Sequence, residues 1–185
     1  MIVYCWTPFL PLSAIYSQKG VIMISNFMEA SGPLKEPLTN DYLFRALVQR
    51  NNRVLIALIC TLLHIGEDTV LSAKVLNPII LGGDPGKVSV MPEVRITYRV
   101  PGSAYAGRFP DHLYLYASGI LQVIRNERNG NPFREKDWNA FFQASTWEEL
   151  QDLSEKSPLF RDAAMTVYEL SNDRHIMSCC HRYNH

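Results

Sequence analysis

The sequence predicts a single mixed α/β domain in which a pair of helices precedes a short central sheet and further helices follow it. Three patterns support this fold class. Apolar residues recur at helical spacing between 43 and 63, and they alternate with polar residues between 94 and 100. Helix-start signals occur at 146–149 and 157–158. The 185 residues are enough for one domain with its own core.

The composition is typical of a globular protein and not of a disordered chain. Apolar residues make up 47% of the sequence and charged residues 19%. The 18 basic residues balance the 18 acidic ones, so any contact with DNA must come from a local basic face and not from the net charge. The four cysteines show no regular spacing, which favours reduced thiols and a cytoplasmic protein.

We expect residues 1–36 to form an apolar leader and a linker outside the fold. Residues 1–16 are almost wholly apolar, but no basic residue precedes Lys19 and two prolines interrupt the run. This pattern fits neither a signal peptide nor a membrane span. One interpretation is translation from upstream of a native start at Met23 or Met28, and the alternative is an export or membrane segment.

The helical pair is predicted from residues 40 to 66. Asn40 and Asp41 are typical helix-capping residues, and the apolar positions of 42–48 lie on one face of a helix. A second apolar run covers 54–65, and Gly66 is the expected stop.

The central region changes to a strand pattern. Residues 70–81 favour β structure, with an interruption at 77–78, and 82–86 form a turn cluster. Residues 94–100 alternate as a half-buried strand does, whereas 113–116 fit either a strand or the start of a helix.

The C-terminal third is predicted to be helical. Trp138, Phe141 and Phe142 share a helix face, 146–149 fit a capping box, and Ser157 with Pro158 starts another helix. That last helix directs five apolar residues toward the core: Phe160, Ala163, Ala164, Val167 and Leu170.

A domain over 37–176 would leave 177–185 as a frayed tail. Several side chains near this end carry atoms that bind zinc, but their spacing matches no established signature, so a frayed helix end is the preferred interpretation. These residues are His175, Cys179, Cys180, His181 and His185.

Two ordered blocks of sequence resemble the recombination-promoting nuclease (transposase) family of the PD-(D/E)XK superfamily. The resemblance implies a restriction-endonuclease-like core, Mg²⁺-dependent DNA cleavage, and motif residues Asn40, Asp41 and Phe44 near the active site. The residue types alone predict helix capping at the first two. The first block comprises 37–45, 54–63 and 76–79, and the second comprises 138–142, 144–150 and 168–171.

The region between the blocks departs from the family pattern. Residues 81–137 are too few for the whole family core and contain no Glu-x-Gln or Glu-x-Lys after a strand. We therefore expect an incomplete catalytic region, for which a deletion, a frameshift and divergence are all consistent explanations.

The best remaining acid pair is Asp84 and Glu93, which we predict as Mg²⁺ ligands. Glu93 and Arg95 are two residues apart on a strand and share a face, so both are candidate catalytic residues. Arginine is a poor replacement for the family's lysine, because its charge is fixed. The alternative is that Asp84 shapes a turn and that Glu93 and Arg95 form an exposed strand face.

Arg45, Arg50 and Arg53 are the candidate DNA contacts, and the alternative for all three is a solvated helix surface. Three functions follow: an active endonuclease, an inactive remnant that associates through its helices with another copy or a full-length paralogue, and an unrelated binding module. The two ordered blocks favour the first two.

Overall fold

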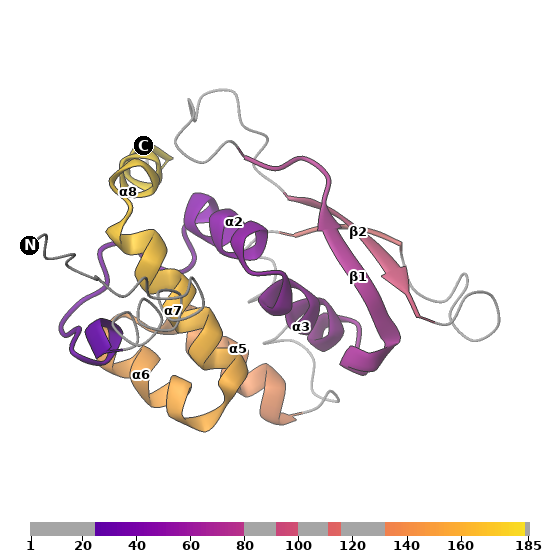
Figure 1. Cartoon of the computed structure of the whole chain (residues 1–185), viewed down its shortest axis with the longest axis horizontal. Helices are drawn as coiled ribbons and strands as arrows, with labels where there is room; N and C mark the ends of the chain where they lie inside the picture. Colours follow the sequence, from indigo (N-terminus) through magenta and orange to yellow (C-terminus); the bar gives the residue numbers. More distant parts are fainter. Residues whose placement is uncertain (1–24, 80–91, 100–110, 116–131, 184–185) are drawn as a thin grey trace, which may run out of the picture. The chain divides into compact units, whose positions relative to one another are not determined.

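The computed structural model describes residues 25–79, 92–99, 111–115 and 132–183. The chain divides into two compact units, Met1–Ala30 and Ser31–His185, and the second contains all the elements described below (Figure 1). Within the described ranges, none of the helices has the length and apolar character needed to cross a membrane. The turn expected at 82–86 lies outside these ranges.

The predicted helical pair is confirmed as α2 (Asp41–Arg50) and α3 (Asn52–Leu62). Asn40 caps α2, because its side-chain oxygen accepts hydrogen bonds from the amides of Tyr42 and Leu43 at 3.0 and 3.1 Å. Asn51 ends α2 and caps α3, and its side-chain oxygen accepts from the Val54 amide at 3.1 Å. The predicted apolar face of α2 is buried.

The end of α3 differs from the prediction. The amide of Ile65 donates to the Cys60 carbonyl at 3.0 Å, and the amide of His64 donates to the Thr61 carbonyl at 3.3 Å. These two bonds form a Schellman motif, in which His64 takes the left-handed position with φ 53°. The helix therefore ends before Gly66, which precedes a short 3₁₀ turn, η1 (Glu67–Thr69).

In the described residues the sheet has three antiparallel strands in the order β1 (Val70–Val75), β2 (Glu93–Tyr98) and β3 (His112–Tyr114). The alternating strand is confirmed, and the ambiguous segment is shown to be a strand. β1 ends before the Asn77-Pro78 interruption, as expected where a proline cannot donate a ladder bond.

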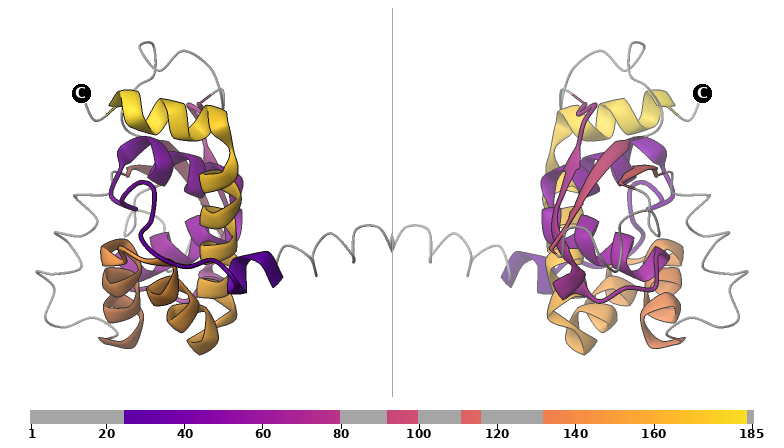
Figure 2. Two further views of the ribbon diagram at one scale, coloured as in Figure 1. Left: turned by 90° about the vertical axis from the view of Figure 1, so that its left-hand side faces the viewer. Right: turned by 90° about the vertical axis from the view of Figure 1, so that its right-hand side faces the viewer.

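One face of the sheet is apolar and covered. The register places Ala73 opposite Ile96 and Val94 opposite Leu113. Ala73, Val94 and Ile96 are buried, and α3 packs against β1. In the right-hand view of Figure 2, β1 and β2 lie nearer the viewer than α7.

The C-terminal helices are α5 (Pro132–Gln143), α6 (Trp147–Lys156), α7 (Pro158–Asn172) and α8 (Arg174–Tyr183). The capping box is confirmed: Thr146 accepts from the Glu149 amide, and the Glu149 carboxylate accepts from the Thr146 amide. Ser157 caps α7, with Pro158 in its first turn.

Trp138 is the centre of an aromatic core that links four helices. Its ring centroid lies 5.8 Å from that of Phe142 in a stacked arrangement and 4.9 Å from that of Phe160 in an edge contact. Phe142 in turn meets Phe44 of α2 at 5.8 Å. The indole Nε1 donates to Thr61 Oγ1 at 3.2 Å, so the one polar atom of this ring has a partner in α3.

The expected domain boundary at residue 37 is wrong. The Leu34 amide donates to the Ser145 carbonyl at 2.8 Å, and the Trp147 amide donates to the Gly32 carbonyl at 3.0 Å. Residues 31–36 therefore belong to the fold, because their backbone pairs with the α5–α6 junction.

The expected frayed tail is wrong for residues 177–183, which form the last part of α8. Cys179 and Cys180 are buried, and α8 packs against α2. The Asn40 amide nitrogen donates to the Cys180 carbonyl at 3.1 Å. The two thiols point into this packing while His175 and His181 are exposed, so the four do not converge as a zinc site.

We predict that Thr61→Val lowers the free energy of unfolding by about 1–3 kcal/mol, because it leaves the buried indole N–H of Trp138 without an acceptor. Thr61→Ser retains the hydroxyl and is the matched control, expected to cost about half as much or less. Urea denaturation measures both. Equal losses in the two variants would contradict a role for the hydroxyl.

We also predict that the buried thiols resist labelling in the native state. Burial raises the pKa of Cys180 to about 12, and the thiolate is the reactive form. In a Cys5→Ser background, a disulfide reagent at pH 8 should label the remaining cysteines only after denaturant is added. Because the folded state disfavours the thiolate, stability should also fall as pH rises above the unfolded thiol's pKa of about 8.5. Rapid native labelling of Cys180 would contradict the burial.

Candidate functional site

Glu93 is the half-buried first residue of β2, and its backbone is fixed on both sides. Its amide donates to Oδ1 of Asn77 at 2.8 Å. Its carbonyl accepts from the Leu76 amide at 2.8 Å. The segment that follows β1 therefore sets the position of this candidate acid.

The same segment is held by two side chains of α2. Arg45 donates through Nη2 to the Asn77 carbonyl. Gln49 pairs with the backbone of Ile79 in both directions, because its Nε2 donates to the carbonyl and its Oε1 accepts from the amide, each at 2.9 Å. A chain of contacts thus runs from α2 through Asn77 to Glu93.

Arg45 has neither of the two expected environments. It was a candidate phosphate contact, with a solvated helix surface as the alternative, but only 3% of the residue is exposed. The reason is that α2 packs into the core over its whole central part, and the guanidinium reaches a carbonyl there. Arg45 therefore positions the backbone and is not part of a surface that meets DNA.

Arg50 and Arg53 do lie at the surface, and each pairs with an acid of α7. Arg50 Nη2 lies 3.6 Å from Glu169 Oε2, and Arg53 pairs with Asp162. Both arginine side chains are about half exposed, so solvent screens these pairs and they contribute little to stability. A DNA phosphate would have to displace a carboxylate from each.

Of the predicted acid pair, only Glu93 lies within the described residues, and Asp84 lies outside them. Whether Asp84 and Glu93 converge on a metal therefore stays a prediction. The shared face of Glu93 and Arg95 is confirmed by the register, which places Glu93 opposite Tyr114 and Arg95 opposite Lys74. In the parts of the chain that the structure describes, no three Asp, Glu, His or Cys side chains gather as a metal site.

The three motif residues have packing roles. Asn40 caps α2 and binds the Cys180 carbonyl, Asp41 lies in the first turn of the helix, and Phe44 packs on Phe142. Capping, the alternative for Asn40, is confirmed. The link from α2 to Glu93 runs instead through Arg45 and Asn77.

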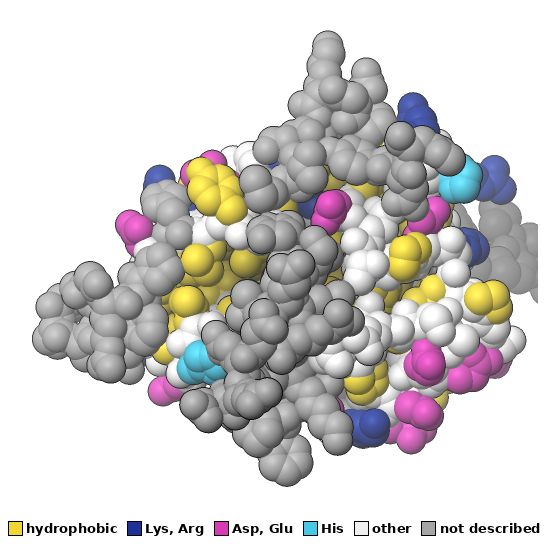
Figure 3. All heavy atoms as spheres, turned by 180° about the vertical axis from the view of Figure 1, so that it is seen from behind, with side chains coloured by type: hydrophobic (Ala, Val, Ile, Leu, Met, Phe, Trp, Pro, Cys, Tyr) yellow, Lys and Arg dark blue, Asp and Glu magenta, His cyan; other side chains and the backbone are white. Residues whose placement is uncertain are grey.

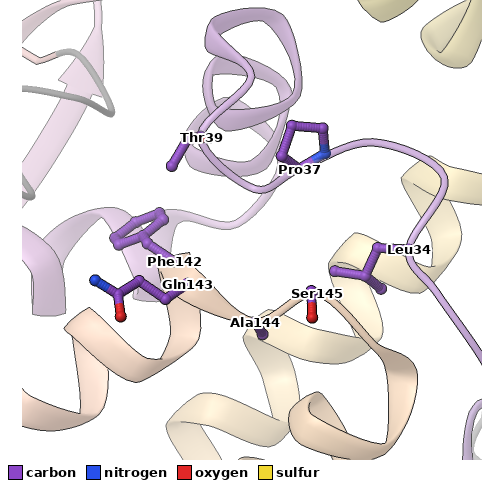
Figure 4. A pocket seen from close by; sticks show the side chains of 7 residues that line it. All are labelled: Leu34, Pro37, Thr39, Phe142, Gln143, Ala144 and Ser145. Carbon is purple, nitrogen blue, oxygen red and sulfur yellow. The ribbon is translucent and has the colours of Figure 1, made fainter.

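An apolar groove lies between residues 34–39 and the α5–α6 junction, with a volume of about 590 Å³ (Figure 4). Its lining contains no titratable side chain, so it offers no acid or base for catalysis. The lining residues are Leu34, Pro37, Thr39, Phe142, Gln143, Ala144 and Ser145.

Comparisons of the chain with protein-family models, with curated proteins and with solved structures gave no match. The family resemblance therefore remains a prediction from the two blocks of sequence.

Gln49 and Asn77 are the residues of this region that the sequence patterns did not single out. Gln49 stands beside Arg50 in what reads as a polar interruption between two helices, and Asn77 precedes a proline, as turn residues often do. Nothing local to either residue indicates its partner, because the contacts join residues 16 to 32 positions apart.

We predict that Asn77→Ala lowers the free energy of unfolding by about 1–3 kcal/mol, because the Glu93 amide loses its acceptor. Asn77→Asp retains an oxygen at that position and is expected to cost less than half as much. Chemical denaturation of the two variants tests the contact. A loss in the aspartate variant as large as that in the alanine variant would contradict a role for the Asn77 side-chain oxygen.

Proposed function

We propose that this chain is a metal-dependent DNA endonuclease of the PD-(D/E)XK type, with a restriction-endonuclease-like core reduced in its central region. Glu93, together with Asp84, would hold Mg²⁺. The proposal rests on the resemblance of the two sequence blocks to the recombination-promoting nuclease family. One structural observation supports it: the first and third segments of the first block contact each other, and the third holds the backbone of Glu93.

These contacts connect residues that are distant in sequence. Arg45 of the first segment contacts Asn77 of the third, and Asn77 fixes the Glu93 backbone. The second segment forms most of α3, which packs against β1 on the covered face of the sheet. Of the two candidate acids, Glu93 is the one within the described residues, and these contacts hold its backbone in place.

The chemistry assigned to these residues is limited to what their groups can do. A carboxylate supplies the hard oxygen ligand that Mg²⁺ prefers, and the bound metal would polarise the phosphate and acidify a water. Arg95 has a fixed charge, so its role would be to bind a phosphate oxygen and not to accept a proton. Asn77 and Arg45 are positioning residues, because they act through the backbone next to Glu93.

The test is Mg²⁺-dependent nicking of supercoiled plasmid DNA by the purified full chain. We predict at least a hundredfold loss of nicking in Glu93→Gln, which retains the size of the side chain but removes its charge. Glu155→Gln removes an exposed acid of α6 and is the control, expected to keep full activity. Parallel denaturation curves check that both variants fold.

Two results would overturn the proposal. Equal nicking in both variants would remove Glu93 from the reaction. No nicking by any form, with Mg²⁺ or Mn²⁺, would favour the alternative of an inactive remnant that acts through association of its helices.

A further inference from the structure

We draw no further inference here: the strongest candidate, the apolar groove between residues 34–39 and the α5–α6 junction, has a lining without charged side chains, and nothing in the described part of the structure shows what covers it.

Discussion

The structure depends on hydrogen bonds from the side chains of α2 and its cap to backbone groups elsewhere in the chain. Those backbone groups have no partner within a helix or strand of their own. A buried carbonyl or amide without a partner is costly, so segments outside regular structure need partners elsewhere. Side chains along α2 and at its N-terminal cap supply them: Asn40 binds the Cys180 carbonyl, Arg45 the Asn77 carbonyl, and Gln49 both backbone groups of Ile79. These contacts connect α8 and the segment after β1 to one buried helix.

The apolar core acts together with these contacts. Trp138 packs on rings from α5 and α7 and donates to Thr61 of α3, while Phe44 brings α2 into the same cluster. Since α3 also packs against β1, the aromatic cluster and the covered sheet face share one helix. On the opposite face of the sheet, Lys74, Arg95 and Tyr114 are exposed.

The charged residues of the fold have different environments. Arg45 is buried and positions a backbone, Arg50 and Arg53 face acids of α7, and Lys74 lies opposite Arg95 on the exposed face of the sheet. A zero net charge thus says little about nucleic-acid binding when acidic residues gather on another element, as they do on α6 (Figure 3).

The sequence by itself determined the local features of this protein. The caps at Asn40 and Thr146 and the alternation of β2 depend on residues only a few positions apart, and all were predictable. The tertiary structure alone decided that Arg45 is buried and that α8 packs on α2. The Asn40–Cys180 contact joins residues 140 positions apart, and such a partner exists only once the chain has folded. Local patterns specify elements, whereas burial depends on which distant surfaces meet.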